Sequence, residues 1–148
     1  MRNYRERLRA PASWWLLGLL CVAMFGTTLW AGFSLLVAVT VYAVLGAGCA
    51  AALLVWGSAT IEVNSGELRA GSASMSLGQA GEVTALDEDQ ARALRGPRAD
   101  PAAFLLIRPY LKRAVYVEVT GQFSGRPYWL IGTRRPAELA AAIESARP

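Results

Sequence analysis

The chain has no histidine and only two cysteines among its 148 residues. The missing histidine excludes catalysis in which an imidazole acts as acid, base or metal ligand. Cys21 and Cys49 both lie inside one long apolar segment, so neither a disulfide-stabilised secreted scaffold nor a zinc site in the polar part is expected. Composition alone therefore excludes many common enzyme mechanisms.

The segment from Ala10 through Ile61 also lacks charged residues, since it contains no Asp, Glu, Lys or Arg. At about 1.5 Å per residue, one helix of that length would be more than twice as long as the ~30 Å hydrocarbon core is thick. We therefore predict two membrane-spanning helices, Ala12–Ala31 and Ser34–Trp56, that form a hairpin around Gly32. Neither span holds an ionisable side chain apart from cysteine and tyrosine, which favours an anchor over a translocation pathway.

The flanking charges predict the orientation of the hairpin. The first eleven residues carry four arginines against Glu6, which we expect to pair with a neighbouring arginine. Under the positive-inside rule this end stays in the cytoplasm, and two spans return the chain to the same side. We therefore expect a multi-pass plasma-membrane protein with both termini cytoplasmic. The expected anchors at the membrane interfaces are Arg5, Arg7, Arg9, Trp14, Trp15, Trp30 and Trp56.

A cleaved signal peptide is the competing interpretation of Met1–Trp30, which has a basic start and an apolar core. That segment lacks an A-x-A-like cleavage site at the right place, and a second apolar span follows at once. We therefore divide the chain into a basic N-terminus (1–11), a transmembrane hairpin (12–57) and a cytoplasmic β-rich domain (58–148).

The residues after the hairpin change from helical to alternating hydrophobic periodicity. This pattern predicts strands at Thr60–Val63, Glu67–Ala70, Ser74–Leu77, Glu82–Leu86, Ala103–Ile107, Ala114–Thr120 and Tyr128–Gly132. Cap and proline signals predict helices at Asp87–Leu94 and, after Pro136, at Ala137–Ala146. Without βαβ alternation a parallel sheet is not expected. The predicted class is α+β, an antiparallel, bent sheet closed by the terminal helix, similar in element order to pleckstrin-homology-like folds.

Several stretches resemble an uncharacterised family of small actinobacterial membrane proteins that is grouped as a domain of unknown function. The matching residues are Tyr4–Leu8, Pro11, Trp14, Trp15, Arg98–Phe104, Arg108–Tyr110, Pro127–Leu130, Thr133–Pro136 and Leu139. The resemblance implies two membrane helices and a C-terminal domain, and it implies no known activity. The chain departs from the family at Gly121–Arg126, where the family tends to carry an acidic, Asp-Pro-rich turn.

Basic and aromatic residues of the predicted domain are the candidates for binding lipid headgroups or an acidic partner: Arg108, Tyr110, Lys112, Arg113, Arg126, Arg134 and Arg135. Solvated loop faces, with Tyr128 and Trp129 in the core, are the alternative. In the second span, small residues recur at four-residue spacing: Gly46, Gly48, Ala50 and Ala52. They would pack against the first span, or against a partner helix or a second copy of the chain.

The sequence contains no phosphate-binding loop, and it offers neither catalytic nor metal-ligand residues, so we expect no cofactor and no enzymatic activity. The basic residues abut a membrane helix, so we expect no nucleic-acid partner. The expected function is a membrane-anchored binding module at the cytoplasmic face of the lipid bilayer. The alternative is an accessory subunit of a larger membrane complex, such as a transporter or an envelope-synthesis enzyme.

Overall fold

The computed structural model describes residues 4–30, 32–121 and 125–147. The chain forms two compact units: Arg9–Ser58 is the helical hairpin, and Met1–Leu8 together with Ala59–Pro148 is the β-rich domain. The predicted basic N-terminus is therefore divided between the two units. The predicted end of the first span, Ala31, lies outside the described residues.

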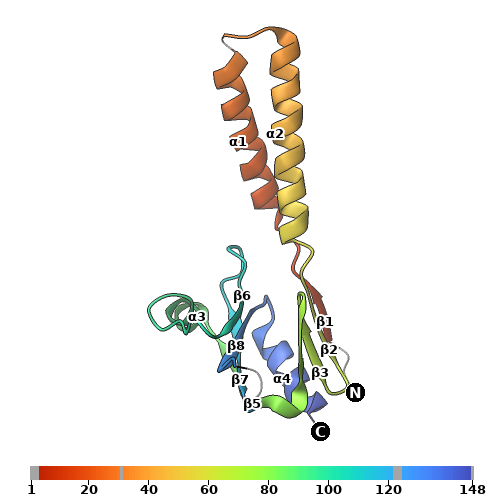
Figure 1. Cartoon of the computed structure of the whole chain (residues 1–148), viewed down its shortest axis with the longest axis vertical. Helices are drawn as coiled ribbons and strands as arrows, with labels where there is room; N and C mark the ends of the chain where they lie inside the picture. Colours follow the sequence, from red (N-terminus) through yellow and green to blue (C-terminus); the bar gives the residue numbers. More distant parts are fainter. Residues whose placement is uncertain (1–3, 31, 122–124, 148) are drawn as a thin grey trace. The chain divides into compact units, whose positions relative to one another are not determined.

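The helical hairpin consists of α1 (Ala12–Trp30) and α2 (Leu35–Trp56) (Figure 1). Glycines of α1 allow the helices to approach closely. A Cβ atom on Gly26 would lie 2.0 Å from the ring of Tyr42, and one on Gly18 would lie 2.6 Å from the Sγ atom of Cys49. Small residues at such contacts are what allows close helix packing when hydrophobic drive is absent.

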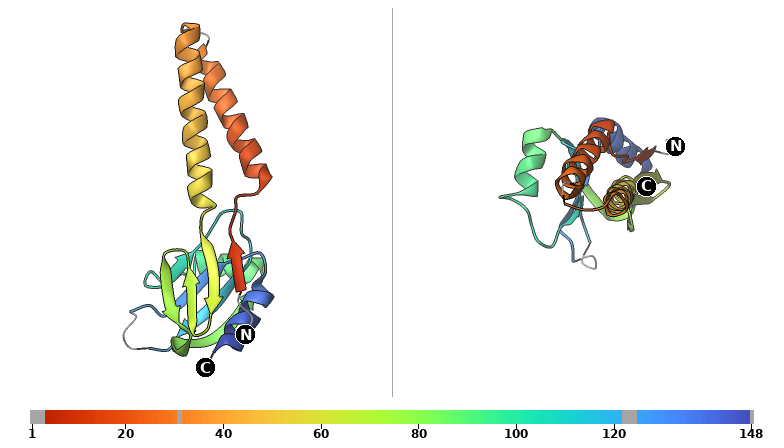
Figure 2. Two further views of the ribbon diagram at one scale, coloured as in Figure 1. Left: turned by 90° about the vertical axis from the view of Figure 1, so that its right-hand side faces the viewer. Right: turned by 90° about the horizontal axis from the view of Figure 1, so that it is seen from above.

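The first sheet of the β-rich domain is an antiparallel meander in the order β1-β2-β3-β4 (Figure 2). Its strands are β1 (Tyr4–Arg7), β2 (Thr60–Asn64), β3 (Glu67–Ala70) and β4 (Ala73–Ser76). Gly66 has a φ of 86° in the turn between β2 and β3, a conformation that residues with a side chain rarely adopt. The sequence pattern does not predict β1, because Arg5, Glu6 and Arg7 are consecutive charged residues.

The second sheet has the order β5-β7-β8-β6. Its strands are β5 (Ala80–Leu86), β6 (Phe104–Leu106), β7 (Ala114–Val119) and β8 (Tyr128–Gly132), and a 3₁₀ turn (Leu77–Gln79) precedes β5. The expectation of a purely antiparallel domain is wrong for one pair, because β6 and β8 are parallel. The physical reason is connectivity: the 107–113 loop reverses the chain, so β7 runs opposite to β6, and β8 is antiparallel to β7.

Two helices complete the β-rich domain. Helix α3 (Glu88–Arg95) begins with the predicted cap, in which the Asp87 side chain accepts a hydrogen bond from the backbone N–H of Gln90 at 2.8 Å. Helix α4 (Pro136–Ala146) begins at the predicted proline. The strand and helix predictions after the hairpin are confirmed to within a few residues at each end.

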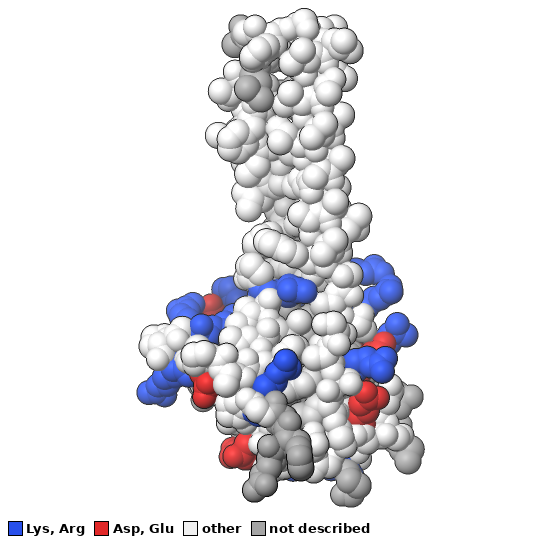
Figure 3. Space-filling model, viewed as in Figure 1, with Lys and Arg blue, Asp and Glu red and all other residues white. Residues whose placement is uncertain are grey.

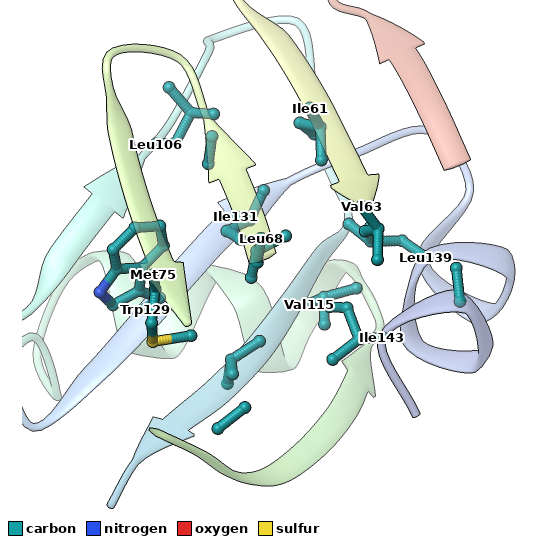
Figure 4. Packing of buried hydrophobic residues seen from close by; sticks show 14 of the residues in the cluster. Ile61, Val63, Leu68, Met75, Leu106, Val115, Trp129, Ile131, Leu139 and Ile143 are labelled. Atoms are coloured by element: carbon teal, nitrogen blue, oxygen red, sulfur yellow. The ribbon is translucent and has the colours of Figure 1, made fainter. Parts of the chain in front are cut away.

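The main core lies between the two sheets and α4 (Figure 4). Ile61 and Leu68 of the first sheet face Val115 and Ile131 of the second, and Ile143 of α4 completes the contact. A smaller cluster covers the other face of the second sheet: Leu86, Ala91, Ala114, Tyr128 and Leu130. All five residues of β8 are buried, as expected for a strand covered on both faces.

Candidate functional site

The chain leaves the β-rich domain at Leu8 and returns to it at Ala59, and these two residues are adjacent. Arg7 of β1 is paired with Thr60 of β2, and the Leu8 N–H donates a hydrogen bond to the Ala59 carbonyl at 2.9 Å. We call this end of the β-rich domain, at Leu8 and Ala59, the junction end. Both helices of the hairpin are covalently attached here.

Three of the predicted binding residues gather at the junction end. The hydroxyl of Tyr110 donates a hydrogen bond to the Leu8 carbonyl at 2.7 Å. Burial raises the pKa of Tyr110, and the nearby guanidinium groups of Arg108 and Arg134 act in the opposite direction. Arg108 and Arg134 are far apart in the sequence, but both lie close enough to influence the same phenol.

A cleft of about 250 Å³ lies in the same domain, beside β1. Its walls come from β1 and from the turn between β8 and α4, and its lining residues are Tyr4, Arg5, Glu6, Arg7, Arg134 and Arg135. We call it the β1 cleft. Two of the arginines expected as membrane-interface anchors, Arg5 and Arg7, therefore lie with two of the predicted binding residues. Figure 3 shows Lys and Arg side chains gathered on the upper part of the β-rich domain, and no charge over α1 and α2.

Glu6 holds β1 against the turn between β8 and α4. One of its carboxylate oxygens accepts hydrogen bonds from the Tyr4 hydroxyl at 2.8 Å and from the Thr133 hydroxyl. The other oxygen accepts from the backbone N–H of Arg134 at 3.1 Å. Thr133 is 1% exposed and is the buried polar residue of the described core, so its hydroxyl needs this acceptor.

The prediction that Glu6 pairs with a neighbouring arginine missed these partners. Arg5 instead pairs across the sheet, with its Nε atom 3.0 Å from the Glu62 carboxylate. The strand pairing is the reason, because it places Arg5 opposite Glu62. The Glu6 side chain contacts Thr133 and Arg134 instead. Burial, followed by the hydrogen bond to Glu6, raises the pKa of Tyr4 far above its usual range, so this hydroxyl stays protonated.

The remaining predicted binding residues lie elsewhere in the domain. The Lys112 Nζ atom is 3.3 Å from the Glu88 carboxylate at the start of α3. Arg126 lies over the ring of Phe104, 5.3 Å from its centroid, before the first residue of β8. The Arg113 carbonyl accepts a hydrogen bond from Thr133 at 3.1 Å. The predicted set is therefore divided among the junction end, the β1 cleft, the neighbourhood of α3 and the start of β8.

Tyr128 and Trp129 are buried in the core, where the alternative interpretation places them. Trp129 is 3% exposed and its ring centroid lies 4.4 Å from that of Phe104. The hydroxyl of Tyr128 accepts a hydrogen bond from the backbone N–H of Asp100 at 3.0 Å. In the turn Gly121–Arg126, where the sequence departs from the family pattern, residues 122–124 lie outside the described residues.

The small residues of α2 do not form one face against α1. Gly46 and Ala50 line an apolar groove of the hairpin, and they do so together with Trp15, Gly18, Leu19, Val22 and Cys49. Gly48 and Ala52 are exposed, and a Cβ atom on Gly46 or Gly48 would meet nothing within 4 Å. The expected packing of all four on the first helix is therefore wrong, because the glycines of α1 make the close contacts instead.

The aromatic residues at the ends of the helices were expected at the membrane interfaces. Trp15, Trp30 and Trp56 are exposed, and the rings of Trp14 and Trp56 form an edge contact with centroids 6.2 Å apart. Helix α2 is long and apolar enough to cross a membrane, with a mean hydropathy of 2.2, whereas the apolar stretch of α1, Ala12–Thr28, is shorter.

Within the described ranges, no group of three or more Cys, Asp or Glu residues lies close enough to hold a metal ion. Sequence reasoning did not find Tyr4, Glu6 and Thr133 as a connected group. The available signal was a lone carboxylate among the N-terminal arginines.

Neither the curated proteins nor the solved structures contain a protein that matches this chain significantly. One protein family does match, over residues 3–143, and it is described as "Protein of unknown function (DUF3093)". Because this match covers nearly the whole chain, the protein belongs to the DUF3093 family.

Proposed function

We propose that this is an integral membrane protein in which α1 and α2 both cross the bilayer and anchor the β-rich domain at the cytoplasmic face. One observation carries this topology: β1 and β2 are paired over four residues, and Leu8 hydrogen-bonds to Ala59. The segment between them must therefore start and finish on the same side of a membrane. If α2 crosses, α1 must cross as well.

The dimensions of the hairpin support two spans. Helix α1 has 19 residues and α2 has 22. At about 1.5 Å per residue they are about 28 and 33 Å long, close to the ~30 Å thickness of the hydrocarbon core. Arginines precede α1, and the positive-inside rule therefore favours the cytoplasm for the β-rich domain.

The function we propose for the β-rich domain is non-enzymatic binding of anionic lipid headgroups at the junction end. Arg7, Arg108 and Arg134 lie on the end of the domain from which both helices leave. A surface attached at that point to two spans would be held at the level of the headgroups. Each arginine near an anionic membrane contributes about 1 kcal/mol to the free energy of membrane binding. The element order, strands in two sheets followed by a C-terminal helix, is similar to that of pleckstrin-homology-like folds, and this analogy favours a surface-binding role.

Cysteine labelling tests the topology. Cys21 and Cys49 are first replaced by alanine, and then either Gly32 or Ser58 is replaced by cysteine. We expect a membrane-impermeant maleimide to label Gly32→Cys in intact cells and to label Ser58→Cys only after lysis. Labelling of Ser58→Cys in intact cells would contradict the proposed orientation.

Hydrogen exchange tests headgroup binding in the full-length protein. The protein is placed in nanodiscs of phosphatidylcholine alone, or of phosphatidylcholine with phosphatidylglycerol. We expect slower exchange with the anionic lipid at the backbone amides of residues 107–113 and 133–135, with β4 as an internal control. Equal exchange in the two lipids would refute lipid binding by the junction end.

A role as an accessory subunit is the second candidate, and the apolar groove between α1 and α2 favours it. Gly18 and Gly46 line the groove, and the absence of side chains at these positions leaves room for another helix to approach. Purification in a mild detergent should then yield a stoichiometric membrane partner, and Gly46→Leu should remove it. Recovery of the protein alone would favour the headgroup-binding module.

A further inference from the structure

The β1 cleft has the size and the lining of a site for a small anion. Its volume of about 250 Å³ is far above the ~10–15 Å³ that one ordered water needs. Four of its six lining residues are arginines, and they come from two segments at opposite ends of the chain. The cleft therefore exists only when β1 is docked against the turn between β8 and α4.

The arginines of the β1 cleft are not all paired with a carboxylate. Arg5 pairs with Glu62, and Arg135 lies 3.2 Å from the carboxylate of Glu138. Arg7 is exposed, and within residues 4–30, 32–121 and 125–147 its side chain has no hydrogen bond or ion pair. Glu6, the carboxylate of the cleft, is held by two hydroxyls and a backbone N–H.

We propose that the β1 cleft binds a single phosphate group, held by the guanidinium groups of Arg7, Arg134 and Arg135. A planar guanidinium with several N–H donors matches the oxygens of a phosphate better than a lysine does. Tyr4 stays a neutral phenol beside the ligand and adds no negative charge. The two hydroxyls on Glu6 already have their acceptor, so the arginines supply the donors that bind the ligand.

This inference rests on the proposed function for one point only, the source of the phosphate. Arg7 directly precedes Leu8, where the chain leaves for α1, so a lipid phosphate is the source that the proposed topology favours. A free phosphate compound has the same chemistry, and the experiment separates the two.

Titration of the full-length protein in neutral detergent tests the site. The probes are inorganic phosphate, dioctanoyl phosphatidic acid and, as a zwitterionic control, dioctanoyl phosphatidylcholine. We expect the phosphatidic acid to bind, and the double variant Arg7→Gln/Arg134→Gln to weaken binding about tenfold or more, because charge-assisted hydrogen bonds are lost. The matched control is Arg69→Gln, an exposed arginine of β3 outside the cleft.

The outcomes separate the sources and the proposals. Equal binding of inorganic phosphate and phosphatidic acid supports the cleft and indicates a free phosphate compound, whereas binding of phosphatidic acid alone supports a lipid source. Arg7→Lys should retain part of the affinity in either case. No binding, or equal weakening by Arg69→Gln, overturns the site. If binding fails while residues 107–113 are still protected in anionic nanodiscs, the headgroup surface stands without this site. If phosphate binds but residues 107–113 are not protected, the phosphate site stands and the headgroup surface is refuted.

Discussion

The two units of this chain differ in the exposure of their apolar side chains: the hairpin exposes most of them, and the β-rich domain buries them. In the hairpin, α2 buries only Ala38 and Leu53 among its described side chains, and large residues such as Leu36 and Phe25 are more than half exposed. In the β-rich domain the apolar residues of both sheets and α4 point into the main core or into the smaller cluster on the other face of the second sheet. An exposed apolar surface as extensive as that of the hairpin is what the proposed position in a lipid bilayer requires.

Removing the hairpin should have the largest effect. We expect a variant in which a short Gly-Ser linker replaces residues 9–58 to fold as a water-soluble domain, because Leu8 and Ala59 are already hydrogen-bonded neighbours. Sedimentation and circular dichroism measure this. The matched control, residues 59–148 alone, lacks β1, so the edge of β2 is unpaired and the buried Thr133 hydroxyl loses its acceptor. A linker variant that sediments like the full chain would contradict a self-sufficient domain.

Glu6→Ala should give the next largest effect, and it affects only the β-rich domain. The substitution removes the acceptor of three donors, of which the Thr133 hydroxyl is buried. A buried donor without a partner costs about 1–3 kcal/mol of unfolding free energy, measurable by urea denaturation of the linker variant. Glu67→Ala, at an exposed ion pair on β3, should change the stability by less than about 0.5 kcal/mol. Equal losses in the two variants would show that Glu6 does not hold β1.

Gly26→Ala tests packing in the other unit. The added methyl group would overlap the ring of Tyr42, so the helices must separate or the ring must turn. Overpacking of this kind costs about 1–3 kcal/mol, and rotation of the ring favours the lower end. Gly48→Ala is the control, since its methyl group meets nothing within 4 Å. The thermal unfolding midpoint of the full chain in detergent should fall for Gly26→Ala alone. A fall for Gly48→Ala would indicate a contact with a second molecule on that face.

The same comparison explains which parts of the fold the sequence predicts. The strands after the hairpin alternate polar and apolar residues, and Asp87 and Pro136 mark helix starts, so local patterns suffice. Strand β1 has no such pattern, because its stability comes from pairing with β2 across the entire apolar segment. The parallel pairing of β6 with β8 depends on the course of the 107–113 loop, which no local residue preference specifies.

The candidate site is predicted only in part for a related reason. Arg108, Tyr110 and Arg134 do lie together, but Lys112 is turned toward α3 only two residues after Tyr110. Neighbours in sequence therefore do not share a surface here. Arg7 and Arg135, at opposite ends of the chain, line the same cleft only because Glu6 docks β1 onto the turn before α4.

Asp87→Ala should have a smaller effect, confined to the start of α3. The Asp87 side chain accepts from the Gln90 N–H, and the Gln90 side chain accepts from the Asp87 N–H at 3.2 Å. Loss of such a cap costs about 1 kcal/mol. Asp89→Ala, at a side chain that is 92% exposed, should cost only a few tenths of a kcal/mol. Urea denaturation of the linker variant measures both, and equal losses would contradict the capping role.

Alkaline pH should produce the smallest effect, again in the β-rich domain. Burial raises the pKa of Tyr4, Tyr110 and Tyr116, so the folded state keeps phenolic protons that the unfolded chain releases above about pH 10. Stability from these groups is therefore fully present below pH 10 and decreases as the pH rises above it, because the unfolded state then binds fewer protons. The free energy of unfolding of Tyr4→Phe should depend less steeply on pH than that of the parent, in urea titrations between about pH 9 and 11. Identical slopes would show that Tyr4 is not held as a neutral phenol against Glu6.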